Sequence, residues 1–119
     1  MKIYTHEWGD HYSVYINIPE GFCKLNIFRE EDRKVADLFD VIVYPEYRGQ
    51  GKGELILATA IEVATSELCD FLLLWPVDVN WIKEWYARHG FTPDARFRNY
   101  EGCPGWCKIL KQEDSHAKD

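Results

Sequence analysis

A chain of 119 residues has room for one domain and one hydrophobic core. Hydrophobic residues make up 46% of it and aromatic residues 15%, so a single folded domain is expected over residues 1–111, followed by a polar, disordered tail over 112–119. The formal net charge of −6 argues against nucleic acid as the partner and favours a cationic one. An anionic ligand would need a locally built site.

The cellular location follows from the apolar runs and the cysteines. The longest apolar run, Phe71 to Val79, is too short to cross a bilayer and contains a proline and an aspartate. The first residues lack the layout of a signal peptide. The four cysteines are spread through a chain with no secretory signal, which favours reduced thiols. We therefore expect a cytoplasmic protein that does not associate with membranes.

The first 44 residues are predicted to form four strands. Apolar and polar side chains alternate with a period of two from residue 12 to residue 18, and Gly9-Asp10 supplies a short hairpin connection before them. The charged run 29–34 is interpreted as a solvated turn, and the fourth strand becomes almost wholly apolar, as in a strand buried on both faces. The predicted strands are Ile3 to Trp8, Tyr12 to Ile18, Cys23 to Phe28 and Val35 to Tyr44.

After Pro45 the period changes to that of a helix. A first helix is predicted over Gly53 to Leu68, and a second over Asn80 to His89 with Gly90 as its C-terminal glycine. The apolar stripe of the first helix is expected to contain Leu55, Ala58, Ile61, Ala64 and Leu68. That of the second contains Ile82, Trp85 and Tyr86.

Between and after the helices, three more strands are predicted. Phe71 to Trp75 is a buried strand stopped by Pro76, and Phe91 to Tyr100 and Trp106 to Lys111 form a hairpin around Pro104-Gly105. The order of four strands, helix, strand, helix and two strands predicts an α/β or α+β fold with a single mixed, mostly antiparallel sheet. A right-handed crossover would make the fourth and fifth strands parallel neighbours.

A glycine-rich loop connects the fourth strand to the first helix. Gly49, Gly51 and Gly53 fall where unpaired backbone N–H groups would point outward at the positive end of the helix dipole. Glycine lets the backbone approach a ligand closely, and Arg48 and Lys52 add local positive charge. The loop therefore predicts a site for phosphate or pyrophosphate. A turn that only joins strand to helix is the alternative.

Two common phosphate motifs do not fit this loop. A nucleotide P-loop needs Ser or Thr after its Gly-Lys pair, but Lys52 is followed by Gly53. A dinucleotide fingerprint needs a glycine at the sixth place, where counting from Gly49 gives Glu54.

The segment Val41-Ile42-Val43-Tyr44-Pro45-Glu46-Tyr47-Arg48-Gly49-Gln50-Gly51-Lys52-Gly53 closely resembles the coenzyme A motif of the GNAT N-acetyltransferase superfamily. That motif is an apolar strand, a turn with proline, and Arg/Gln-x-x-Gly-x-Gly. Downstream, Trp85-Tyr86-Ala87-Arg88-His89-Gly90-Phe91 is similar to the superfamily's second signature, an aromatic-Tyr pair followed by Gly-Phe. The match covers about residues 35 to 91, and the order of elements extends it over the rest.

The resemblance implies an acetyl-coenzyme A-dependent N-acetyltransferase that uses no metal. The fourth and fifth strands would splay apart to admit the pantetheine arm, and a backbone N–H on the fourth strand would polarise the acetyl carbonyl. A deprotonated amine then attacks that carbonyl directly. Pantetheine would pair with Val41, Ile42 and Val43, and the pyrophosphate with Arg48, Gly49, Gln50, Gly51, Lys52 and Gly53.

Three further residues acquire roles from the resemblance. Tyr86 occupies the position of a tyrosine that protonates the departing thiolate, although a core aromatic would look the same. Asp37 is the candidate for the general base, because it lies fourteen residues before Gly51, where histone-type relatives carry a glutamate. An ordinary strand carboxylate is the alternative. Asp40 is the other nearby acid, and alternation along the strand would place it on the opposite face. Asn80 resembles an asparagine that contacts the cofactor or a water, and helix N-capping explains it equally well.

Two features limit the functional interpretation. Cys103-Pro104-Gly105-Trp106-Cys107 has no second Cys or His pair at zinc spacing, so we interpret it as a hairpin turn with two incidental thiols. Relatives usually place two helices between the first two strands, where this chain has only Gly9-Asp10. Either the acceptor site is open to a small-molecule or peptide amine, or a second copy completes it as a homodimer, or the chain is a non-catalytic coenzyme A-binding or interaction module. We expect the enzyme.

Overall fold

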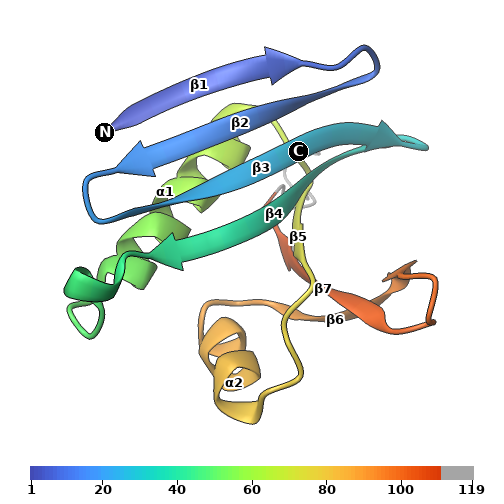
Figure 1. Ribbon diagram of the computed structural model, residues 1–119. Helices are drawn as coiled ribbons and strands as arrows, with labels where there is room; N and C mark the ends of the chain where they lie inside the picture. Colours follow the sequence, from blue (N-terminus) through green and yellow to red (C-terminus); the bar gives the residue numbers. More distant parts are fainter. Residues whose placement is uncertain (111–119) are drawn as a thin grey trace, which may run out of the picture.

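The computed structural model describes residues 1–110, which form one seven-stranded sheet with two α-helices (Figure 1). The strands follow the spatial order β1-β2-β3-β4-β5-β7-β6. The elements are β1 Lys2–Glu7, β2 His11–Ile18, β3 Gly21–Glu30, β4 Arg33–Val43, the short 3-10 helix Pro45–Tyr47, α1 Lys52–Ser66, β5 Phe71–Leu74, α2 Asn80–Arg88, β6 Thr92–Arg98 and β7 Pro104–Ile109. The predicted order of elements and the mixed sheet are confirmed. The predicted tail over 112–119 lies outside the described residues.

One parallel pair joins the two halves of the sheet. β4 pairs with β5 only through Val35–Phe71, Ala36–Leu72 and Asp37–Leu73. β4 continues to Val43, whereas β5 ends at Leu74, and Figure 1 shows the two strands diverging beyond their short contact. The predicted parallel pair and its splay are therefore both present.

The core lies between α1 and one face of β2, β3 and β4. Alternate residues of each strand point toward the helix, as the period of two requires. Each such side chain contributes about 1.5–3 kcal/mol when it is fully buried. The strand residues in this core are Val14, Ile16, Ile18, Cys23, Leu25, Ile27, Ala36 and Leu38, and α1 supplies Ile56, Leu57, Ala60 and Ala64. No helix in the described part of the chain is both long and apolar enough to span a membrane.

The buried stripe of α1 differs from the predicted one. Leu55 is 46% exposed and Leu68 is 79% exposed, while Ile56 and Leu57 are fully buried. The prediction was wrong because three apolar residues stand in succession at 55–57, so the sequence allows more than one phase for the stripe.

Two turns also differ from the predictions. The run 29–34 is mostly strand, and only Glu31-Asp32 forms the turn, with Glu31 at a φ of 58°. Gly105 lies buried inside β7 rather than at a hairpin tip, because a Cβ there would come within 2.6 Å of the Leu73 side chain. The β6–β7 connection is formed instead by residues 99–103, where the Asn99 side chain accepts two backbone N–H bonds.

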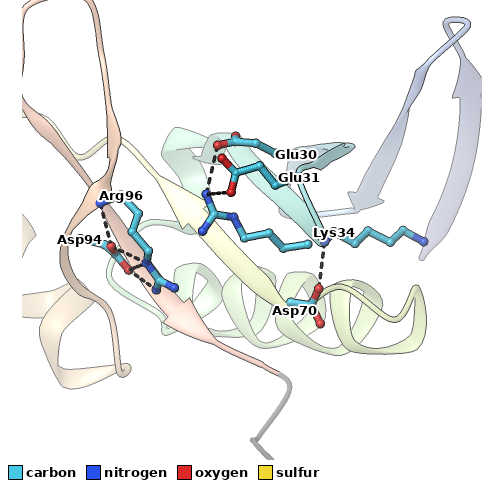
Figure 2. A network of polar contacts seen from close by, with 7 residues as sticks. Glu30, Glu31, Lys34, Asp70, Asp94 and Arg96 are labelled. Carbon is cyan, nitrogen blue, oxygen red and sulfur yellow. Dashed lines mark hydrogen bonds and ion pairs between the residues drawn. The ribbon is translucent and has the colours of Figure 1, made fainter.

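Polar contacts clamp the end of the sheet where β4 begins. The Arg33 guanidinium also lies 5.1 Å from the Phe97 ring, and that of Arg96 lies 4.6 Å from the Phe71 ring, so β6 is attached to β4 and β5. This end is closed, and the strands are free to separate only at the other end. Figure 2 shows the ion pairs of Arg33 with Glu30 and Glu31, the N–H of Lys34 on Asp70, and the pair of Arg96 with Asp94.

Candidate active site

A β-bulge interrupts β4 at the point where it leaves β5. Lys24 pairs with Phe39 and Phe22 pairs with Ile42, so β4 has one more residue than β3 in this interval. Asp40 takes up the extra length at a φ of 58° and is exposed. The simple alternation that placed Asp40 opposite Asp37 therefore does not apply. The bulge also turns Val41 and Val43 toward the α1 core.

The splay opens a pocket of about 850 Å³ between the end of β4 and α2. The backbone groups on the β5 side of β4 have no strand partner beyond Asp37. Most of the residues predicted to hold a cofactor line this pocket; Gln50 and Asn80 do not. The lining residues are Val41, Ile42, Val43, Tyr47, Arg48, Gly49, Gly51, Lys52, Gly53, Glu54, Trp81, Ile82, Trp85 and Tyr86.

The glycine loop forms one wall of the pocket and presents backbone to it. Gly49 and Gly51 have φ values of 81° and 78°, which favour glycine, and nothing lies within 4 Å of the place a Cβ would take. Gly51 is the N-cap of α1 and no side chain caps the helix. Within the described chain, the N–H groups of residues 52–54 meet no acceptor, and the first bond of this turn is Leu55 to Gly51. The helix dipole adds to the positive potential there.

The two cations of the loop already have protein partners. The Arg48 Nε donates to the Val43 carbonyl at 2.9 Å, which closes the loop on the end of β4. The Lys52 ammonium lies 3.7 Å from a carboxylate oxygen of Glu20. The loop wall therefore offers mainly backbone N–H groups to an anion. The Arg48 and Lys52 side chains add positive charge nearby while they are paired with Val43 and Glu20.

The second wall is α2, whose end is fixed by its own backbone. The N–H of Gly90 bonds the carbonyl of Ala87 at 3.0 Å, and that of Phe91 bonds the carbonyl of Tyr86 at 3.2 Å. With Gly90 at a φ of 93° these bonds form a Schellman motif, and the rings of Tyr86 and Phe91 make its usual apolar contact at 5.7 Å. The spacing from Tyr86 to Gly90 and Phe91 in the sequence is therefore the one that this motif requires, and the motif fixes Tyr86 in the pocket wall.

The environment of Tyr86 suits a proton donor. Burial raises the pKa of its phenol above the ordinary value of 10.0, and the nearby Cys23 adds to the effect. Burial also raises the pKa of the Cys23 thiol to about 12, so both groups stay protonated at neutral pH. The Tyr86 ring packs edge-on against Trp85 with centroids 5.0 Å apart. A protonated phenol with a fixed ring can donate to an anion that forms in the pocket.

Asp37 lies outside this pocket, on the face of the sheet opposite α1. It pairs across the sheet with Asn26 on β3 and Leu73 on β5. Burial raises the pKa of its carboxyl to about 6, against a lowering by a hydrogen bond from Trp75. Its Oδ1 is buried and meets no hydrogen-bond partner in the described chain. A half-buried carboxylate with a free oxygen and a raised pKa of about 6 can accept a proton.

The remaining sequence predictions divide clearly. Asn80 is the first residue of α2, but the N-cap is Val79 and no side chain caps the helix, so the capping interpretation was wrong. The Gln50 amide donates to the Glu46 carbonyl within the loop. Cys103 is exposed and Cys107 is buried, and no group of three metal-ligating side chains occurs in residues 1–110.

Sequence reasoning missed part of the pocket wall. Tyr47, Glu54, Trp81 and Ile82 line the pocket without having been predicted to do so. The signal available in the sequence was helical spacing, since Trp81 lies four residues before Trp85 and Ile82 four before Tyr86, and residues four apart share a helix face. Glu54 lies in the first turn of α1, where its carboxylate is 3.5 Å from the His89 Nε2 and links the two walls.

Comparison with known proteins agrees with this geometry. The sequence model of the acetyltransferase (GNAT) domain matches residues 8–93. An uncharacterized N-acetyltransferase from Methanocaldococcus jannaschii is 33% identical over 98 residues, which cover 79% of this chain and 41% of the relative. The chain thus spans less than half of that relative's length.

Solved structures show a similar fold. An acetyltransferase of the GNAT family from Staphylococcus aureus superposes with a TM-score of 0.60 at 18% identity, over 85% of this chain and 69% of that one. An N-acetyltransferase from Thermoplasma acidophilum, solved in complex with coenzyme A, gives a TM-score of 0.56 at 15% identity, over 84% and 61%. At these identities the likeness concerns the fold.

Proposed function

Because the chain belongs to the GNAT acetyltransferase family, we propose that it transfers an acetyl group from acetyl-coenzyme A to a primary amine by direct attack. The family supports acyl transfer; the donor and the acceptor are the finer part of the proposal. The observation that carries it is the continuous path from the free N–H groups of the loop, along the unpaired edge of β4, to the phenol of Tyr86.

The proposed cofactor would occupy that path from end to end. The N–H groups at the start of α1 suit the pyrophosphate, because a helix N-terminus attracts anions. β4 has no strand partner on this side beyond Asp37, so its backbone near Val41 and Val43 suits the amide groups of pantetheine, which can pair with it as another strand would. The Val43 carbonyl is already held by Arg48, which would have to release it to a ligand. Acetyl-coenzyme A supplies an activated acyl group when it is bound, and no metal takes part in the proposal.

The chemical roles then follow from position and protonation state. The amine nitrogen forms a bond to the acetyl carbon, the C–S bond breaks, and the sulfur leaves as a thiolate. Tyr86 donates the proton that this thiolate needs, since its phenol is kept protonated by burial. Asp37 takes the proton that the amine loses, and solvent returns it to the phenolate of Tyr86.

The acceptor would approach from the face opposite α1, where Asp37 lies. Figure 1 shows no helix over β1 to β3 on this face in residues 1–110. A small-molecule or peptide amine has free access there, and a homodimer that covers this face would complete the site. The face includes Ser13, Tyr15, Lys24, Asn26 and Phe39 beside Asp37. We place the protein in the cytoplasm, on the cysteine usage of the sequence.

The alternative function is a non-catalytic coenzyme A-binding or interaction module of the same fold. The short Gly9-Asp10 connection favours it, because nothing in the chain order supplies the usual acceptor-covering helices. The test is to measure coenzyme A release from acetyl-coenzyme A against a panel of amines and peptides. Amine-dependent release supports the enzyme. Tight cofactor binding with no release above background for any acceptor would leave only the binding module.

A further inference from the structure

One aromatic residue of the pocket wall differs from its neighbours on α2. Trp81 lines the pocket and is 69% exposed, while Ile82, Trp85 and Tyr86 are half-buried. Trp85 and Tyr86 pack on the core, whereas Trp81 makes no ring or cation contact within residues 1–110. An indole left this exposed in a pocket wall has a free face, and a flat ligand can use it.

The position of Trp81 on α2 puts it at the outer rim of the pocket. Trp81 and Trp85 are one helical turn apart, so their side chains share a face of the helix. Trp85 lies against the first turn of α1, where its ring is 3.9 Å from the place a Cβ on Gly53 would take. Trp81 is one turn farther toward the start of α2, and its exposure shows that it faces solvent at the mouth rather than the interior.

The order of groups in coenzyme A decides what meets that rim; this step rests on the proposed function. Pantetheine and the adenosine part leave the pyrophosphate in opposite directions. If the N–H groups at 52–54 hold the pyrophosphate and β4 holds the pantetheine, the adenosine part must project toward the mouth. We propose that Trp81 is the adenine platform of this protein, with the purine stacked on its indole.

The expected strength comes from known base–aromatic stacking. When the aromatic residue of such a stack is replaced by alanine, the affinity for the ligand that carries the base falls by about tenfold or more. The backbone of the loop and of β4 would not lose any contact in the variant. The inference therefore predicts a loss that depends on the ligand carrying the base, which a general disturbance of the pocket would not produce.

The experiment compares two ligands against three variants. Binding of coenzyme A and of 4′-phosphopantetheine, which lacks the adenosine part, is measured by calorimetry with the full chain. Trp81→Ala should weaken coenzyme A by about tenfold or more and leave phosphopantetheine unchanged, and Trp81→Phe should retain most of the affinity. Trp8→Ala removes an equally large residue that is 51% exposed and lies outside the pocket, and should change neither.

The outcomes separate this inference from the function it rests on. Equal losses for both ligands in Trp81→Ala, or no loss for either, would overturn the adenine platform and leave the cofactor assignment standing. If the unaltered chain binds neither ligand, the proposed function fails and takes the platform with it. A melting curve of each variant without ligand shows that it is folded, so a loss of affinity can be assigned to the contact.

Discussion

The two walls of the pocket recognise a ligand in different ways. The loop wall, Gly49 to Glu54, presents N–H groups of the backbone and has room where Cβ atoms would stand. The α2 wall presents the side chains of Trp81, Trp85 and Tyr86. Ligand binding by the loop wall should be lost when a substitution adds a side chain to a glycine. The function of the α2 wall should be lost when a substitution removes part of a side chain. Substitutions can therefore distinguish binding, which the loop should dominate, from chemistry, which α2 should dominate.

The largest expected effect is on the loop wall. Gly51→Val places a branched side chain in the space of the pyrophosphate and should abolish acetyl-coenzyme A binding, as measured by calorimetry. Gly9→Val is the matched control, since Gly9 also has a positive φ of 93° and open space around it but lies outside the pocket. Both variants carry backbone strain. Equal binding by the two would show that the loop wall does not hold the cofactor.

Tyr86→Phe tests the chemistry of the α2 wall. The substitution keeps the ring but removes the proton donor, so turnover should fall by ~10²-fold or more while cofactor affinity is retained. Stability should change little, because the Tyr86 hydroxyl makes no hydrogen bond within residues 1–110 that the substitution would break. Tyr12→Phe is the opposite control: its hydroxyl donates to Glu67 at 2.5 Å, away from the pocket. That variant should lose about 1 kcal/mol of stability and keep its turnover. Near-normal turnover in Tyr86→Phe removes the phenol from the mechanism.

Asp37 belongs to neither wall, and pH should reveal its role. With a pKa of about 6, it is a base only above that pH, so kcat/KM should decline as pH falls through 6, and Asp37→Asn should lower turnover by about 10²-fold at pH 7.5. Because burial raises this pKa above 3.8, folding favours the protonated form. The Asp37 carboxyl therefore contributes its full stabilisation of the folded state below about pH 3.8, and this contribution is lost as the pH rises through 6.

Asp37→Asn should therefore remove that pH dependence. Relative to the variant, the unaltered chain should lose up to roughly 3 kcal/mol of unfolding free energy between pH 4 and pH 7, as measured by denaturant unfolding. An unchanged difference across this range would mean that the carboxyl is not buried in the way described. A pH–rate profile with no limb near 6 would contradict its role as base.

The smallest expected effect is on the support of the α2 wall. Gly90→Ala forces a Cβ into the left-handed region and should cost about 1–2 kcal/mol of stability. Gly102→Ala imposes the same backbone strain at a φ of 83° in the β6–β7 connection, but there nothing lies near the added Cβ, whereas at Gly90 it would come within 2.6 Å of the Lys108 Nζ, which must move aside. Both should melt earlier, but only Gly90→Ala should also slow turnover. Equal turnover in the two variants would show that the Schellman motif does not position Tyr86.

Local rules predicted the parts of the site that are local in the chain. The glycines of the loop and the Tyr86-to-Phe91 spacing each encode a geometry that depends on a few neighbouring residues, and both are present. The parallel β4–β5 pair followed from the order of elements. The loop and Gly90 were predicted from the preferences of glycine at helix ends, the parallel pair from the handedness of crossovers, and the role of the Tyr86-to-Phe91 spacing from the resemblance to the family.

The features that depend on distant packing were not predictable. The bulge at Asp40 reverses the alternation of β4, and no glycine or proline marks it in the sequence. Gly105 is a strand residue because Leu73 and Trp75 occupy the space of a Cβ, a contact across about thirty residues that only the sheet order reveals. The exposure of Trp81 and the burial of the Asp37 Oδ1 without a hydrogen-bond partner in the described chain also depend on distant packing.

The central claim is that the pocket between β4 and α2 binds acetyl-coenzyme A, and the melting temperature of the chain tests it most directly. Ligand at about a hundred times its dissociation constant should stabilise the folded state by roughly 2.7 kcal/mol, and ATP and NAD at the same concentration should do much less. The account predicts a clear rise with acetyl-coenzyme A and with coenzyme A. No shift with either, or an equal shift with NAD, would contradict it.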